Sequence, residues 1–158
     1  KGAIIFSYPV KNPRRFGVVT VKGKKIVSLI EKPKNTNSNL AITGLYFFDN
    51  SVIKKTLSLK NSKRNELEII DLLKMYKKNN LLKTEAFGRG AAWLDAGTIE
   101  DFNQTSLFVS AIEKRQGLKI ACLEEIAFSN KWINKNKLRE AISFYGNCDY
   151  SKYLRGLF

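Results

Sequence analysis

Short apolar runs dominate the first half of the sequence, whereas apolar residues recur at helical spacing in much of the second half. The short runs are rich in β-branched and aromatic residues, which favours strands. The segment Lys22-Gly23-Lys24 places a glycine between two such runs and predicts a hairpin turn. The strands predicted in this way cover residues 3–10, 16–21, 25–30, 40–48 and 83–87.

Most of the helices are predicted from apolar spacing together with the residues at their ends. Asn65, with Glu68 three positions later, has the pattern of a capping box, and apolar residues recur after it as far as Tyr76. Asn134 and Gly146 have the residue types that begin and end a helix. Besides the helix after Asn65, helices are predicted for residues 49–59, 123–129, 135–145 and 150–157.

A longer helix is predicted between Thr98 and Gly117. The side chains of Thr98 and Asp101 can cap its first turn, and a glycine after the last turn is typical of a helix end. The residues predicted to face inward on this helix are Ile99, Phe102, Val109 and Ile112. Because the strands come early and the helices late, the chain is predicted to be a mixed α/β protein.

The composition limits the chemistry that the chain can carry. Its 158 residues, of which 44% are hydrophobic, suit one domain with a sizeable core. There is no histidine, and Cys122 and Cys148 form no CxxC pair, so His-based triads and zinc sites with histidine ligands are excluded. A metal bound here would have oxygen ligands, which points to Mg²⁺. No apolar run is long enough to predict a transmembrane helix.

The charge is strongly basic, with 28 Lys and Arg against 14 Asp and Glu and a net charge of +14. Such a balance is compatible with nucleic acid, an anionic surface or an anionic substrate. The charge is mostly lysine and is scattered, and no segment clusters arginine with aromatic residues as nucleic-acid binders do. We therefore predict no nucleic-acid partner and keep a basic nucleic-acid-binding domain as an alternative, which a salt-dependent DNA affinity would support.

The predicted hairpin brings together residues that are far apart in the sequence. Gly17 lies at the start of one strand, and Glu31-Lys32 follows the other. Gly17 would let a ligand approach the backbone, Glu31 could accept sugar hydroxyls, and Lys32 could hold a phosphate. Taken alone, the segment Glu31-Lys32-Pro33 is more typical of a solvated loop.

Further candidate positions lie later in the chain. Gly44, inside a predicted strand, indicates either a close approach of a ligand or a packing glycine. Arg64 precedes a predicted helix start, and helix amides with an arginine can form a phosphate site. Asp95 lies between an apolar run and Gly97, where it could bind a metal or accept hydrogen bonds from nearby amides.

In this order and spacing, the segments resemble glucose-1-phosphate thymidylyltransferases over nearly the whole chain. The motifs that carry the resemblance are FGVV, EKP, TGLYFFD, ELEI, GRGAAWLDAGT and EKRQGLKIACLEEIA. EKP and WLDAGT are shared with other sugar nucleotidyltransferases, whereas the last motif indicates the thymidylyl branch. The resemblance implies that this is the carboxy-terminal part of a Rossmann-like nucleotidyltransferase fold, with a mixed sheet, a hairpin and late helices.

The resemblance also implies a reaction, in which glucose 1-phosphate attacks dTTP, pyrophosphate leaves and dTDP-glucose forms. It assigns Lys32 and Arg64 to the sugar phosphate as catalytic residues, and Asp95 to Mg²⁺. The sugar pocket that it implies comprises Gly17, Glu31, Lys32, Thr43, Gly44, Tyr46 and Arg64. The regulatory nucleotide site that it implies comprises Arg89, Glu113, Arg115 and Gln116.

A division of roles along the chain follows from the same resemblance. Residues 1–97 would bind the sugar phosphate and the metal, and residues 98–158 would form a helical part for assembly or regulation. The family further implies a cytoplasmic homotetramer in dTDP-rhamnose and polysaccharide biosynthesis. A homo-oligomer is therefore expected for the full-length protein, with no nucleic-acid or membrane partner.

Parts of the family pattern do not occur in this sequence. The family begins with a glycine-rich GxGTRL loop that binds the triphosphate, and it supplies a first metal-binding aspartate. We therefore expect a fragment that lacks the nucleotide-binding part and has no measurable turnover alone. Two other functions stay open: a non-catalytic sugar-phosphate-binding or assembly module, and a sugar-1-phosphate nucleotidyltransferase that uses UTP, CTP or ATP.

Overall fold

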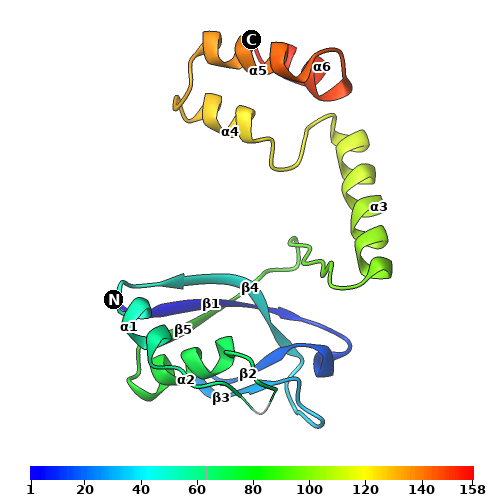
Figure 1. The fold of residues 1–158 in the computed structure, drawn as a ribbon. Coiled ribbons are helices and arrows are strands. Elements are labelled where there is room, and N and C mark those ends of the chain that lie inside the picture. Colours follow the sequence, from blue (N-terminus) through cyan, green and yellow to red (C-terminus); the bar gives the residue numbers. More distant parts are fainter. Residues whose placement is uncertain (63) are drawn as a thin grey trace. The chain divides into compact units, whose positions relative to one another are not determined.

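Two compact units make up the chain in the computed structural model, which describes residues 1–62 and 64–158. The first unit, Lys1–Trp93, holds the strands, and the second, Leu94–Phe158, is helical (Figure 1). The boundary lies just before Asp95, which therefore belongs to the helical unit.

The first unit is built on a five-stranded mixed sheet with the order β3-β2-β4-β1-β5 (Figure 1). The strands are β1 (Ala3–Pro9), β2 (Gly17–Lys22), β3 (Lys25–Glu31), β4 (Leu40–Phe48) and β5 (Leu82–Ala86). β1 and β5 run parallel, and the other neighbours run antiparallel. The sheet curls so that its edge strands β3 and β5 come into contact. The five predicted strands are thus confirmed.

The β2–β3 hairpin fixes the positions of two candidate residues. A short 3₁₀ helix, η1 (Pro13–Arg15), leads into β2. The turn contains Gly23 with a φ of 59°, a conformation that glycine adopts without strain. The strand register then pairs Gly17 with Glu31, so the hairpin brings them together as predicted.

Helix α2 (Ile69–Lys78) covers one face of the sheet, beside α1 (Ser51–Leu57) (Figure 1). Its Ile70 and Leu73 are fully buried against the sheet, and burial of such side chains stabilises a fold by about 1.5–3 kcal/mol each. The sheet residues of this cluster are Ile5, Val19, Ile26, Leu29 and Ile42. A neighbouring cluster joins Ala3, Leu72 and Tyr76.

Asp49 connects three elements of the first unit. Its Oδ1 accepts hydrogen bonds from the Ser51 hydroxyl at 2.5 Å, the Ser51 amide at 3.0 Å and the Tyr76 hydroxyl at 3.2 Å. Its Oδ2 accepts one from the Gly2 amide at 2.7 Å. The hydrogen bonds from Ser51 and Gly2 lower the pKa of Asp49 to about 2. An ionised Asp49 therefore holds the start of β1, the start of α1 and helix α2 together.

The start of α2 differs from the prediction. Asn65 adopts a left-handed conformation with a φ of 60°, and the N-cap residue of the helix is Glu68. The capping box predicted for Asn65 and Glu68 is therefore wrong. The reason is that the Glu68 side chain bonds to Arg64 instead of turning back to the backbone of Asn65.

Four helices form the second unit: α3 (Ile99–Gln116), α4 (Leu123–Ser129), α5 (Lys135–Tyr145) and α6 (Asp149–Arg155). The predicted ends of α3 are confirmed, because Thr98 Oγ1 accepts the Asp101 amide at 3.1 Å and Gly117 has a φ of 70°. The ends of α5 are confirmed as well, at Asn134 and Gly146. Among the described helices, none is long and apolar enough to cross a membrane.

The prediction that α3 has a buried side is wrong for this chain. Ile99 is 84% exposed, Phe102 is 60% exposed, and Val109 and Ile112 are only partly covered. Within the described residues, the core of this unit lies among α4, α5 and α6, and its buried members are Cys122, Leu138, Ile142 and Leu154. Helical spacing identified the helix correctly, but spacing does not show whether the chain itself supplies a partner for the apolar side.

Candidate functional site

A pocket of about 450 Å³ lies where the end of β3 meets the segment that leads into α2. Its lining residues are Glu31, Lys32, Ser62, Arg64, Glu68, Ile70, Asp71 and Lys74. The pocket thus brings together Glu31, Lys32 and Arg64, three of the site residues that are predicted from the sequence.

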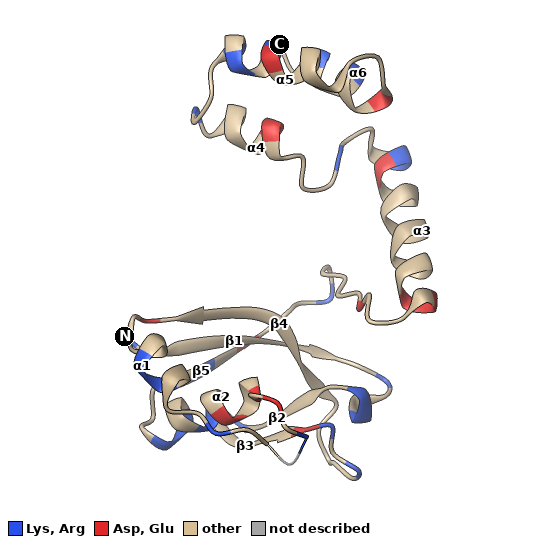
Figure 2. Ribbon diagram, in the orientation of Figure 1, with Lys and Arg blue, Asp and Glu red and all other residues tan. Residues whose placement is uncertain are grey.

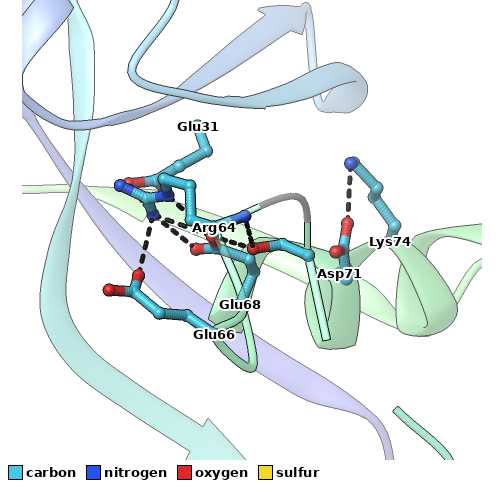
Figure 3. Close-up of polar contacts among 7 residues, drawn as sticks. Glu31, Arg64, Glu66, Glu68, Asp71 and Lys74 are labelled. Carbon is cyan, nitrogen blue, oxygen red and sulfur yellow. Dashed lines mark hydrogen bonds and ion pairs between the residues drawn. The ribbon is translucent and has the colours of Figure 1, made fainter. Parts of the chain in front are cut away.

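Arg64 is held by Glu68 through a fork of hydrogen bonds (Figure 3). Nε donates to Oε1 of Glu68 at 3.0 Å, and Nη2 donates to Oε1 at 2.8 Å and to Oε2 at 2.9 Å. Nη2 also lies 3.3 Å from Glu66 Oε2 and 3.9 Å from Glu31 Oε1. The hydrogen bonds raise the pKa of Arg64 and lower that of Glu68, so both groups stay charged at neutral pH.

Ser62 fixes the carboxylate of this pair. Its hydroxyl donates to Glu68 Oε1 at 2.9 Å and accepts the backbone amide of Arg64 at 3.1 Å. The side chain of Glu68 is 13% exposed, whereas that of Arg64 is 44% exposed. The carboxylate therefore lies on the protein side of the pair, and the guanidinium lies toward the solvent.

The two lysines of the pocket differ in their partners. Lys74 Nζ lies 2.8 Å from Asp71 Oδ1 (Figure 3). The exposed Lys32 side chain forms no ion pair with any residue that the structure describes. Its backbone amide donates to the carbonyl oxygen of Phe16 at 3.1 Å, and its φ is 40°. Of the two lysines, Lys32 is the one whose ammonium group is available to an anion.

Gly17 lies beneath side chains of the pocket. A Cβ atom added at Gly17 would lie 3.0 Å from Cδ1 of Ile70 and 3.1 Å from Oε2 of Glu31. The space above this glycine is therefore occupied by Ile70 and Glu31 rather than left open. Because Gly17 has no side chain, there is room for the carboxylate of Glu31 at the wall of the pocket.

Three candidate residues on β4 lie outside the lining of this pocket. Thr43 is 1% exposed and donates its hydroxyl to the carbonyl oxygen of Phe6 at 3.1 Å, so it joins β4 to β1. Gly44 is exposed, and no atom lies within 4 Å of a Cβ added there. Burial raises the pKa of Tyr46, and the charge of Glu31 raises it further.

Asp95 is the candidate metal ligand and belongs to the second unit. Its carboxylate lies against Gly97, where Oδ2 would be 3.3 Å from an added Cβ, and its carbonyl oxygen accepts the Thr105 hydroxyl at 3.3 Å. Across the described residues, no group of three or more His, Cys, Asp or Glu could hold a metal ion. Mg²⁺ needs only one or two protein carboxylates when water and phosphates complete its shell, so Asp95 fits as a single ligand.

The residues predicted for a regulatory nucleotide site lie in both units. Arg89 is exposed in the loop after β5, whereas Arg115 and Gln116 are exposed at the end of α3. Glu113 accepts hydrogen bonds from Lys119 Nζ at 2.7 Å and from the Ile120 amide at 2.9 Å, which lower its pKa. Glu113 therefore holds the turn that follows α3.

Sequence reasoning missed part of the pocket. The lining residues that were not nominated as site residues include Ser62, Glu68, Asp71 and Lys74. Asp71 and Lys74 lie three residues apart on α2, which is a known signal for contact on a helix, whereas Arg64 lies before the helix and has no such signal. The sequence predicts Glu68 as part of a helix cap, whereas its carboxylate pairs with Arg64.

The distribution of charge over the fold agrees with the scattering seen in the sequence. Lys and Arg occur on most elements of both units (Figure 2). Asp and Glu occur at the start of α2 and at the end of β3, on the elements that form the pocket (Figure 2). The pocket therefore combines both signs of charge, which suits a ligand with an anionic group and several hydroxyls.

Comparisons with known sequences agree on one family. Residues 1–111 match the profile described as Nucleotidyl transferase. The glucose-1-phosphate thymidylyltransferase of Neisseria meningitidis serogroup A is 46% identical over 154 residues, which are 97% of this chain and 54% of that protein. That of Xanthomonas campestris pv. campestris is 41% identical over 158 residues, 99% of this chain and 54% of that protein. The chain thus spans about half the length of these curated relatives.

Comparisons with solved structures point to the same fold. A candidate glucose-1-phosphate thymidylyltransferase from Bacillus anthracis, in complex with sucrose, has a TM-score of 0.62 and 35% identity. The match covers 68% of this chain and 43% of that one. A UDP-glucose pyrophosphorylase in complex with UDP-glucose has a TM-score of 0.60 at 24% identity, covers 72% of this chain and 45% of that one, and shows the fold alone.

Proposed function

The chain belongs to the nucleotidyl transferase family, and we propose that it carries the sugar-phosphate side of a glucose-1-phosphate thymidylyltransferase. The observation that carries the proposal is the pocket in which Glu31, Lys32 and Arg64 meet. Curated relatives with that activity, at 46% and 41% identity, support the choice of reaction. In this reaction dTMP passes from dTTP to glucose 1-phosphate, and the products are dTDP-glucose and pyrophosphate.

Lys32 and Arg64 are the proposed phosphate ligands. A phosphate oxygen of glucose 1-phosphate forms a bond to the α-phosphorus of dTTP, and the bond to the pyrophosphate leaving group breaks. Such a transfer depends on positioning and on neutralising negative charge, rather than on covalent chemistry by the protein. Lys32 supplies a compact point charge, and Arg64 supplies N–H donors in a fixed plane.

Glu31 is the proposed ligand of the sugar. A carboxylate can accept hydrogen bonds from two neighbouring hydroxyls, and Gly17 leaves room for it at the pocket wall. The open space over Gly44 supports a sugar on this side of β4, where Tyr46 is also proposed to line the sugar pocket. Thr43 contributes by joining β4 to β1 beneath the site.

Asp95 is the proposed ligand of Mg²⁺. When bound, Mg²⁺ neutralises phosphate charge and orients the phosphates of the nucleotide. The resemblance places a triphosphate-binding loop and another metal-binding aspartate in a part of the family pattern that this sequence does not contain. We therefore propose that the 158-residue chain binds the sugar phosphate but does not turn over alone.

An assay on the purified chain tests this proposal. Isothermal titration with glucose 1-phosphate should show binding that Lys32→Ala and Arg64→Ala each weaken. Pyrophosphate release with dTTP, glucose 1-phosphate and Mg²⁺ should stay at the level of buffer. Absence of binding would contradict the sugar-phosphate site, and turnover well above buffer would contradict the inactivity. Binding without turnover is also what a sugar-phosphate-binding module would give, whereas turnover with UTP, CTP or ATP would identify another nucleotidyltransferase.

The helical unit is the proposed site of assembly and regulation. Ile99, Phe102 and Leu107 of α3 are 84%, 60% and 66% exposed, which supports contact with another chain of a cytoplasmic homo-oligomer. The proposed regulatory nucleotide residues are Glu113, Arg115 and Gln116 of this unit, together with Arg89 of the first unit. Sedimentation of the chain, alone and with dTDP-glucose, tests both roles. A monomer that does not bind the nucleotide sugar would argue against them.

A further inference from the structure

We propose that Glu68 is a positioning residue that sets the direction of the Arg64 guanidinium, so that Nη1 is presented to the phosphate of the ligand. The inference rests on the proposed function, since it takes Arg64 as a phosphate ligand. It adds a residue that never touches the ligand and acts only through Arg64.

The first argument is the geometry of the fork. With the described residues, the guanidinium makes its contacts through Nε and Nη2, which bond to Glu68 at 2.8–3.0 Å (Figure 3). Nη1 takes no part in them and keeps two N–H groups for a ligand. A two-point contact fixes the plane of an arginine as well as its position, which one hydrogen bond cannot do. Glu68 therefore determines where the remaining donors of Arg64 point.

The second argument is the way in which Glu68 itself is held. Its side chain is 13% exposed and receives the Ser62 hydroxyl at 2.9 Å, while the same hydroxyl accepts the Arg64 amide at 3.1 Å. The Ser62 hydroxyl therefore joins the carboxylate of Glu68 to the backbone of Arg64. An arginine in solvent samples many rotamers, and ordering them in advance lowers the entropic cost of binding.

Glu66 provides a matched comparison. It is also a carboxylate beside Nη2, at 3.3 Å, but its side chain is 64% exposed and makes a single contact with Arg64. If Glu68 served only to neutralise Arg64, Glu66 and Glu68 would both weaken anion binding and would differ only in the size of the effect. Removal of either negative charge would then strengthen the binding of every anion. A positioning role instead predicts weaker binding of glucose 1-phosphate, whose phosphate is held in place by its sugar, but not of inorganic phosphate, which is free to follow the guanidinium.

The experiment compares glucose 1-phosphate with inorganic phosphate by isothermal titration on the full 158-residue chain. Glu68→Gln keeps the size of the side chain and removes its charge. It should weaken glucose 1-phosphate binding about tenfold, as is usual for a residue that orients a ligand-binding group, without weakening inorganic phosphate. Glu66→Gln should change both affinities by less than about twofold, because its ion pair is exposed. Tighter binding of both anions by Glu68→Gln, or no change with glucose 1-phosphate, would overturn the proposal.

A double-mutant comparison shows whether Glu68 acts through Arg64. In the Arg64→Ala background, Glu68→Gln should cause no further loss of glucose 1-phosphate affinity, since the group that it orients is gone. A further loss of similar size would overturn the proposal. If Arg64→Ala alone has no effect on affinity, the proposed function of Arg64 fails instead.

An NMR measurement separates the two failures without any ligand. The Nε–H proton of Arg64, bonded to Glu68 at 3.0 Å, should exchange slowly with solvent in the native chain. It should exchange fast in Glu68→Gln and remain slow in Glu66→Gln, while circular dichroism shows an unchanged fold. Fast exchange in the native chain would overturn the positioning role even if glucose 1-phosphate binds.

Discussion

Gly17 faces Glu31 across the β2–β3 hairpin, and Oε2 of Glu31 lies 3.1 Å from where a Cβ of residue 17 would be. The proposed sugar-binding carboxylate therefore rests against a position without a side chain. Ile70 of α2 fills the rest of this space, with Cδ1 at 3.0 Å. The pair of Gly17 and Glu31 thus connects the wall of the pocket to Ile70, a residue of the core.

Gly17→Ala is predicted to damage the pocket more than the fold. The new methyl group must displace the ends of Ile70 and Glu31, and such overpacking costs about 1–3 kcal/mol of unfolding free energy. The displaced carboxylate should weaken glucose 1-phosphate binding but not inorganic phosphate binding, which urea unfolding and titration would measure. Gly44→Ala, whose Cβ meets no atom within 4 Å, is the control for stability. An unchanged glucose 1-phosphate affinity in Gly17→Ala would refute the prediction.

Lys32→Met is predicted to reduce the affinity for glucose 1-phosphate and for inorganic phosphate. A hydrogen bond to a charged group contributes about 1.5–3 kcal/mol, which corresponds to about 10- to 100-fold in the dissociation constant. The dependence of glucose 1-phosphate affinity on salt should also become weaker, since one cation is lost. Lys34→Met removes a nearby exposed lysine that does not line the pocket and should change little. Equal losses in the two variants would show that only the overall charge matters.

Asp49 is predicted to make the first unit sensitive to acid. Its pKa is lowered from 3.8 to about 2, so its stabilising effect is complete above the ordinary value and declines as the pH falls toward 2. Urea unfolding of native chain and Asp49→Asn between pH 2 and pH 6 would measure the effect. The difference in stability between them should be largest near pH 6 and shrink toward pH 2. A constant difference would contradict this origin of the acid sensitivity.

Leu73→Ala and Leu138→Ala are predicted to destabilise different units. Both leucines are fully buried, Leu73 between α2 and the sheet and Leu138 among the late helices. A leucine-to-alanine change in a core costs about 2–5 kcal/mol. Hydrogen exchange should then speed up in β4 amides for Leu73→Ala and in α5 amides for Leu138→Ala. The reverse assignment, or equal effects in both units, would contradict the division of the chain at Trp93.

Sequence reasoning succeeded where local chemistry decides the structure. Gly23 and Gly117 adopt the left-handed conformations that end a strand or a helix, and the side chain of Thr98 caps α3 as its residue type predicts. The predicted cap at Asn65 was wrong, because Glu68 bonds to Arg64 instead. This contact depends on a turn in which Asn65 has a positive φ. Apolar spacing on α3 gave the helix but not its exposure, since exposure depends on which other elements are present.

The candidate site was predicted in part. The hairpin pairing of Gly17 with Glu31 follows from turn position, and so does the placement of Lys32 beside them. The approach of Arg64 to the same pocket depends on how α2 packs on the sheet, which no local pattern encodes. The hydrogen bonds of Ser62 and Glu68 around Arg64 depend on where α2 begins and on how it packs on the sheet, so the sequence alone does not predict them.

The parallel pairing of β1 with β5 has a consequence for the synthesis of this chain. Ala3 pairs with Leu82 and Ser7 with Ala86, so the first strand acquires one of its neighbours only after the whole intervening segment has been made. Pairings between distant segments slow folding, because the ends of a long loop must meet before any contact stabilises them. On the ribosome, that edge of β1 therefore keeps unpaired backbone groups until β5 emerges, and until then it can pair with other chains.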